Sequence, residues 1–327
     1  MKIGLVMPIY GQWVHGEEVW AVCEKAKEIG VDSLYFVDHI IITPQQAIGQ
    51  QGGYMDIWTA MSYVAAVTNV QGWAPTLGQC AAVVPYRPPI QQAKIAATVD
   101  SLSGGRLLIG AGTGYLETEF QALGLNILER SDMADEYIKA MIELWTHPVA
   151  SFHGKYVNFD EMTISVRPAQ QPHPRILWVA RGERAYRRIA QFCQGWGDSP
   201  GRGDSEALKG TEAAWSEVCR FWKEYGRTGE PYFALGPRPC HLTTRRSRSG
   251  EAVVVDAAPG TQPSTTLFPV THVDDLVDQI RSFEAIGAHE FAVRPASYRW
   301  GEFDSLTMLL NQMDLLAEHV LPKFRRG

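Results

Sequence analysis

An adjacent aspartate and histidine, Asp38 and His39, directly follow the apolar segment Asp32–Val37. That segment is typical of a buried parallel strand, and ligands bind at the carboxyl ends of strands in α/β proteins. A histidine at such a position can transfer a proton near neutral pH, or contact the ring of a bound molecule. The alternative is structural: His39 is a hydrogen-bonded structural residue and Asp38 caps the next turn. Its position at the carboxyl end of a strand favours a catalytic or binding role for His39 over a structural one.

A glycine-rich turn, Gly110–Tyr115, follows another short apolar segment. Glycine allows a backbone to approach a ligand closely, and successive N–H groups can cradle phosphate oxygens. Gly112, Thr113 and Gly114 are therefore candidate cofactor contacts, and Tyr115 can offer a phenol to a substrate. The alternative is a plain strand-to-helix turn followed by a tyrosine that only packs.

A third candidate site begins at Arg181, where the sequence Arg-Gly-Glu-Arg follows the apolar segment Arg175–Ala180 and opens a helical pattern. The first N–H groups of a helix and its positive dipole end attract anions. Arg181 or Arg184 would strengthen such an anion site around Gly182. Alternatively, Glu183 is an ordinary first-turn acid and both arginines are solvated.

Several other chemistries lack support in this sequence. The nine histidines form no HExxH motif or other close metal-ligand spacing, so no metal site is expected. The five cysteines are scattered without a CxxC pair, as in a reduced cytoplasmic protein. With a net charge of −6, nucleic-acid binding is not expected.

The elements that must position these residues alternate strictly along the chain. Eight apolar strands separated by helical patterns predict an α/β fold, a TIM (β/α)8 barrel. The other possibility is an open doubly wound sheet, but no GxGxxG motif opens a helix after the first strand. The expected strands are residues 2–8, 32–37, 74–84, 107–111, 175–180, 195–199, 232–243 and 290–294.

Two segments stand outside this repeat. Ser151–Phe159 has the pattern of a β-hairpin with its turn at His153–Gly154. Arg238–Thr266 is rich in Arg, Ser, Thr, Pro and Gly, and we expect it to be a mobile insertion, with a lid over the site as one possibility. Residues 1–327 otherwise form a single domain. No apolar stretch approaches the roughly 20 residues that span a bilayer, which favours a cytoplasmic protein away from membranes.

The longest distinctive segment is RPPIQQAKIAATVDSLSGGRLLIGAGTGYLETEFQALG, which begins at Arg87. Arg130 and the helix DEYIKAMIELW follow it, and VDH, DIW, FHGKYVNF and RPAQQPHPRILWVA occur in order around it. Together these motifs, which span Lys2 to about Ser199, resemble the bacterial-luciferase-like family of flavin- and deazaflavin-dependent oxidoreductases.

This resemblance implies a TIM barrel with an insertion after its fourth unit and, often, a homodimer. It implies that reduced FMN or the deazaflavin F420 binds at the carboxyl face, with a non-proline cis peptide at Cys80–Ala81. The phosphate would lie near Gly182–Ala185. The implied cofactor-binding residues are Asp38, Cys80, Ala81, Gly112, Thr113, Gly114, Arg181, Gly182, Glu183, Arg184 and Ala185.

The motifs look most like the F420-dependent branch, which implies hydride transfer between F420 and a small organic substrate, with His39 and Tyr115 as catalytic residues. One alternative is a monooxygenase that receives FMNH2 from a separate reductase and protects it in a dry pocket lined by Trp58, Tyr86 and Tyr115. A non-catalytic flavin-binding protein is the other. Sugar-phosphate oxidisers of the family carry Glu where this chain has Tyr115, so that activity is not implied.

Overall fold

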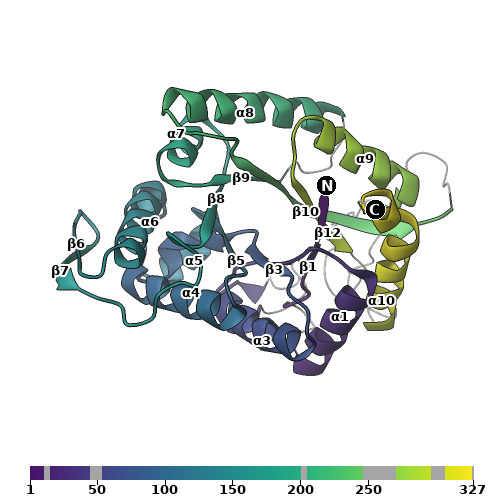
Figure 1. Ribbon diagram of the computed structural model, residues 1–327, viewed down its shortest axis with the longest axis horizontal. Helices are drawn as coiled ribbons and strands as arrows, with labels where there is room; N and C mark the ends of the chain where they lie inside the picture. Colours follow the sequence, from purple (N-terminus) through teal and green to yellow (C-terminus); the bar gives the residue numbers. More distant parts are fainter. Residues whose placement is uncertain (11–14, 45–53, 200–204, 246–269, 296–305, 326–327) are drawn as a thin grey trace.

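A closed parallel β-barrel forms the centre of the molecule (Figure 1). The computed structural model describes residues 1–10, 15–44, 54–199, 205–245, 270–295 and 306–325. Around the barrel the strand order is β10-β12-β1-β2-β3-β5-β8-β9, and β9 pairs with β10 to close it. These strands are β1 (Lys2–Val6), β2 (Ser33–Phe36), β3 (Thr76–Gln79), β5 (Leu107–Gly112), β8 (Arg175–Val179), β9 (Gly195–Asp198), β10 (Tyr232–Thr243) and β12 (Glu290–Pro295).

The TIM barrel predicted from the alternating pattern is thus confirmed, and each expected strand segment contains one barrel strand. The strands are continuous apolar runs because residues pointing outward meet helices while residues pointing inward fill the barrel. All residues of β2 and β5, for example, are buried. One layer inside the barrel consists of Val6, Tyr35, Leu108, Leu177, Ala234 and Ala292.

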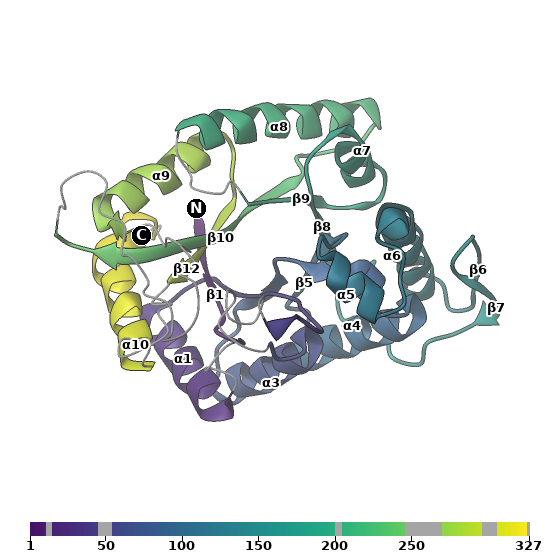
Figure 2. The same ribbon diagram turned by 180° about the vertical axis from the view of Figure 1, so that it is seen from behind.

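Helices form a ring around the strands in Figure 1. They bury an apolar face against the barrel, and most expose a charged one. Their bounds are α1 (Gly16–Ile29), α3 (Ile57–Val70), α4 (Pro89–Ser103), α6 (Arg130–Thr146), α7 (Glu183–Phe192), α8 (Ser205–Glu224), α9 (Val273–Ala285) and α10 (Leu306–Leu315), which continues as a π-helical turn, Leu316–Val320. A further short helix, α5 (Glu117–Ala122), lies inside this ring beside β5 (Figure 2).

The expected hairpin is present as β6 (Ala150–His153) and β7 (Asn158–Met162), an antiparallel pair beside α6 at the edge of the molecule (Figure 1). It lies between the fourth and fifth strand–helix units, where the resemblance places an insertion.

The expected strand 232–243 is present in full, so the other insertion does not begin at Arg238, where the overlapping prediction placed it. Residues 238–243 belong to β10, where they pair with β12 and with the short strand β11 (Val270–His272). The strand continues because these two partners satisfy its backbone groups, although its sequence is rich in proline and arginine. Residues 246–269 lie outside the described part of the chain.

Within the described residues, no helix has the length and apolar character needed to cross a membrane. The same part of the chain contains no group of three or more His, Cys, Asp and Glu side chains arranged to hold a metal ion.

Candidate active site

A buried carboxylate holds His39 at the end of β2. His39 Nδ1 lies 2.9 Å from Oε2 of Glu119, a fully buried residue on α5. Burial would raise the pKa of Glu119, but the hydrogen bonds from His39 and from the Ile40 backbone N–H outweigh it and lower the pKa below its usual value. Glu119 is therefore ionised at neutral pH and can only accept hydrogen bonds from its neighbours.

Aromatic rings surround the other side of His39. The Tyr54 ring centroid is 4.7 Å from that of His39, and the Tyr115 ring meets it edge-on at 6.2 Å. Tyr54 in turn packs on Tyr10 at 5.4 Å, and Arg294 at the end of β12 donates a 2.9 Å hydrogen bond to the Tyr10 hydroxyl. An exposed tyrosine, a histidine and an arginine thus share one face of the barrel, the face that holds the strand carboxyl ends.

Asp38 has a different role from its neighbour. Its two carboxylate oxygens accept hydrogen bonds of 2.8 and 2.9 Å from the Arg87 guanidinium, and one of them also accepts the Val83 N–H. Arg87 additionally bonds Asp56, the residue that caps α3. Asp38 is 4% exposed. It therefore ties the end of β2 to the segment after β3, and so fixes the backbone that carries His39.

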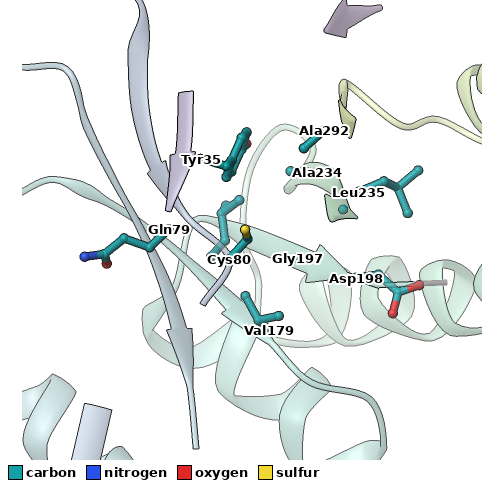
Figure 3. Close-up of a pocket in the computed structure, with 11 residues that line it drawn as sticks. Tyr35, Gln79, Cys80, Val179, Gly197, Asp198, Ala234, Leu235 and Ala292 are labelled. Atoms are coloured by element: carbon teal, nitrogen blue, oxygen red, sulfur yellow. The ribbon is translucent and has the colours of Figure 1, made fainter. Parts of the chain in front are cut away.

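The peptide bond Cys80–Ala81 is cis, at the position that the family resemblance implied. It follows β3 directly and lies beside a small apolar pocket in the barrel mouth (Figure 3). Cys80 and Val179 reach toward Tyr35 across this pocket, whereas the Gln79 side chain points away. The pocket is lined by Tyr35, Gln79, Cys80, Leu177, Val179, Gly197, Asp198, Ala234, Leu235, Gly236 and Ala292.

Burial raises the pKa of the Cys80 thiol to about 12, although the nearby Arg294 cation lowers it in part. Cys80 is therefore a neutral thiol at physiological pH and part of an apolar wall. Arg294 also partly offsets the effect of burial on Tyr54, whose pKa is raised to about 12. The same cation is close to both Cys80 and Tyr54, so the pocket and the His39 cluster are parts of one site.

The glycines of the turn are required by contacts within the protein. A Cβ on Gly110 would lie 1.8 Å from the backbone oxygen of Gln79, and one on Gly112 would lie 3.1 Å from the Ala81 Cβ. Gly114 has φ 78° and packs against Val83. These residues let β5 approach the segment that contains the cis peptide. Packing within a strand-to-helix turn therefore explains why these positions are glycine. Thr113 is partly exposed and Tyr115 is exposed, so both side chains can reach a ligand.

Among the described residues the start of α7 has no side-chain cap, but the arginines beside it already form ion pairs. Gly182 precedes the helix with φ 106°, and the first N–H groups of any helix lack an intrahelical acceptor. Arg181 forms two hydrogen bonds, of 2.8 and 2.6 Å, with Asp198. Arg184 pairs with Asp132 and Asp135. Positive charge at this helix start therefore comes mainly from the backbone.

The structure brings His39 and Tyr115 together, and places Cys80–Ala81 and the start of α7 on the same face of the barrel. Sequence reasoning missed Glu119, Tyr54, Tyr10 and Arg294. A usable indication existed for Glu119, because it lies next to the apolar Phe120 in the quoted motif ETEF and these two residues form the buried face of α5. Tyr54 had no comparable indication, since nothing local places it against His39.

Comparison with known proteins agrees with this architecture. A model of the luciferase-like monooxygenase family matches residues 6–258. The FMNH2-dependent dimethylsulfone monooxygenase of Pseudomonas putida is 34% identical over 115 residues, which are 34% of this chain and 31% of that relative. The chain thus matches about a third of that curated relative's length.

Two solved structures have the same fold over nearly the whole chain. Monooxygenase RslO1 from Streptomyces bottropensis superposes with a TM-score of 0.78 at 22% identity, covering 99% of this chain and 100% of the other. The coenzyme F420-dependent tetrahydromethanopterin reductase from Methanopyrus kandleri gives 0.73 at 16% identity, covering 99% of each chain. At these identities the likeness concerns the fold.

Because the family match covers well over half of the chain, the protein belongs to the luciferase-like monooxygenase family.

Proposed function

We propose that the protein binds a flavin-type ring across the mouth of its barrel and that His39 exchanges a proton with a small organic substrate beside that ring. The observation that carries this proposal is the His39–Glu119 pair, which lies among exposed aromatic rings on the same face as the apolar pocket at Cys80. A protonatable group, a flat apolar wall and a cation meet there, as redox chemistry on an organic substrate requires.

The residues present fit such a cofactor. One wall of the pocket is apolar and includes the small residues Ala234, Gly236 and Ala292, on which a flat ring would pack. The start of α7 offers backbone N–H groups for a phosphate, as helix starts do for anions. Gly182, Glu183 and Ala185 would contribute through their backbone, and the exposed Arg184 side chain would lie beside them.

The bound cofactor would supply a hydride or activate oxygen. The protein would bind the substrate, position His39 and stabilise developing charge. Tyr54 and Tyr115 would hold the substrate against His39, which lies 13% exposed between them. Glu119 would hold the imidazole of His39 through Nδ1, while Nε2 of His39 faces the substrate. The Arg294 cation would favour negative charge that develops near Cys80.

Two cofactors are candidates. F420, which the sequence motifs favour, would make the protein a hydride-transferring oxidoreductase. FMNH2 is the second candidate, supported by the FMNH2-dependent relative, and would make it a monooxygenase supplied by a separate reductase. Arg181 and Arg184 are paired with aspartates, so the described anion site suits a single phosphate better than a tail with many carboxylates.

The test is a fluorescence titration of the purified protein with F420 and with FMN, each in the oxidised and reduced state. We expect saturable one-to-one binding of one of the two, tighter in the redox state that the reaction consumes. The variant Glu183→Pro would remove one backbone N–H of the phosphate seat at the first position of α7, where proline is tolerated, and should weaken binding about tenfold. Gly16→Pro, at the first position of the distant helix α1, serves as control. Failure of both cofactors to bind would overturn the proposal.

We also propose that the protein is a homodimer that pairs through α3 and α4, two neighbouring helices. α3 has no charged residue, and Lys94 and the buried Asp100 are the charges of α4. Apolar side chains nevertheless project outward from both helices: Tyr63, Val70, Ile90 and Leu102 are 42, 78, 46 and 60% exposed. Such a face can pack on its own copy without opposing like charges.

The dimer is tested with a charge placed on this face. We expect Ala66→Glu, on the exposed side of α3, to convert the dimer to monomer in sedimentation velocity, because the new carboxylate would be buried without a partner. Ala213→Glu, on the exposed side of the charged helix α8, is the matched control and should stay dimeric. A monomeric parent protein, or a dimer that tolerates Ala66→Glu, would contradict the proposal.

A cytoplasmic location completes the proposal. Cys23, Cys80, Cys193, Cys219 and Cys240 form no disulfide bond, as is typical of a reducing compartment. Recovery of the protein in a periplasmic or membrane fraction would contradict this assignment.

A further inference from the structure

Glu119 has a full set of hydrogen-bond donors around its carboxylate. Oε1 accepts the backbone N–H groups of Ile40 at 2.8 Å and Ile41 at 3.3 Å. Oε2 accepts the Tyr86 hydroxyl at 2.9 Å and lies 2.9 Å from His39 Nδ1. The two oxygens are thus divided: Oε1 binds the loop backbone, and Oε2 binds side chains.

This division decides which nitrogen of His39 carries a proton. An ionised carboxylate has no hydrogen to give, so a short contact between Nδ1 and Oε2 requires Nδ1 to be the donor. In the neutral imidazole Nε2 is then the unprotonated nitrogen. It has no hydrogen-bond partner among the described residues, and the rings of Tyr54 and Tyr115 lie beside the imidazole.

We propose that Glu119 is a positioning residue that fixes His39 in its Nδ1–H tautomer, so that Nε2 is the atom that exchanges the proton with the substrate. This inference deepens the proposed function and rests on it for the role of Nε2. Tyr86 assists from the side by satisfying the second lone pair of Oε2. The charged and titratable groups around the pair are Tyr54, Tyr86, Tyr115 and Arg294.

The variant Glu119→Gln tests this assignment, because it should change the tautomer of His39. The glutamine carbonyl would replace Oε1, because the Ile40 and Ile41 N–H groups need an acceptor. Its NH2 group would then occupy the place of Oε2 and donate to His39 Nδ1. The substitution therefore preserves the hydrogen bonds to the Ile40 and Ile41 backbone. It requires Nδ1 of His39 to accept a hydrogen bond instead of donating one, so the proton of the neutral imidazole must move to Nε2.

The experiment is 15N NMR of histidine-labelled protein at a pH high enough for the imidazole to be neutral. The variant His39→Gln is used to assign the His39 signal. We expect the Nδ1–H tautomer in the unmodified protein and the Nε2–H tautomer in Glu119→Gln. Tyr86→Phe is the control: it removes one donor to Oε2 and should leave the Nδ1–H tautomer unchanged. An Nε2–H tautomer in the unmodified protein, which requires no variant to observe, would overturn the inference, as would an unchanged tautomer in Glu119→Gln.

Turnover with the cofactor identified by titration separates this inference from the function it serves. We expect Glu119→Gln to lower kcat by about 100-fold or more, in the range of general acid–base contributions, and Tyr86→Phe to lower it far less. A tautomer that switches while kcat stays constant would confirm the positioning by Glu119 and would overturn proton transfer by His39. A merely structural Glu119 would change neither the tautomer nor the pH dependence of kcat.

Discussion

Gly110→Ala should unfold the protein or destabilise it by about 3 kcal/mol or more, because overpacking against backbone has no flexible atom that can yield. The new Cβ would lie 1.8 Å from the Gln79 carbonyl oxygen and 2.8 Å from its carbon. To relieve this clash, β5 and β3 must separate just before Cys80. We expect a large drop in the midpoint of urea unfolding followed by circular dichroism, and weaker cofactor binding in any folded fraction.

A matched substitution controls for the glycine-to-alanine change itself. Gly16 opens α1, and a Cβ there would meet nothing closer than the Tyr63 hydroxyl oxygen at 3.4 Å, an ordinary contact. Gly16→Ala should therefore leave the midpoint near that of the parent. If Gly110→Ala unfolded at the same urea concentration as Gly16→Ala, the close approach of β5 to the cis-peptide segment would be refuted.

Arg87→Met should lower the free energy of unfolding by about 3–5 kcal/mol, the range found when one partner of a buried ion pair is removed. The Asp38 side chain is 0% exposed, and Arg87 is its bidentate partner at 2.8 and 2.9 Å. Methionine fills similar volume without charge, so the Asp38 side chain would stay buried without its cationic partner. The expected result is a lower denaturation midpoint at pH 7, with part of the loss recovered in Asp38→Asn/Arg87→Met.

The comparison for this prediction is an arginine that also binds two carboxylates but lies on the surface. Arg220 pairs with Glu217 and Glu224 on α8 and is 45% exposed. Arg220→Met should scarcely move the midpoint, because exposed pairs contribute little. Equal effects of Arg87→Met and Arg220→Met would show that the Asp38–Arg87 pair does not hold the end of β2.

The order of the elements could be predicted because the chain marks their limits locally. Pro89 begins α4, and parallel strands buried on both faces give uninterrupted apolar segments. For β10 the strand 232–243 was predicted, but an insertion from Arg238 was predicted as well, because Pro237, Arg238 and Pro239 resemble a loop. Pairing with residues 270–272 decides between the two and extends the strand to Thr243. Such a partner is distant in sequence and cannot be recognised from local composition.

The site was predicted in part for the same reason. His39 and Tyr115 follow strands, so the barrel must bring them to one face. Whether an arginine is free for a ligand depends instead on distant carboxylates: Asp198 engages Arg181 and Asp132 engages Arg184. Glu119 could be recognised only as the glutamate on the buried side of α5, beside Phe120, and not as the partner of His39, because that contact joins residues 80 positions apart.

A crystal structure of the protein with the cofactor that it binds would show where the ring and the phosphate lie. We expect the ring against the apolar wall beside Cys80–Ala81, one edge near His39 Nε2, and the phosphate on the backbone N–H groups at residues 183–185. A cofactor seated on another face, or a phosphate far from the start of α7, would contradict this expectation.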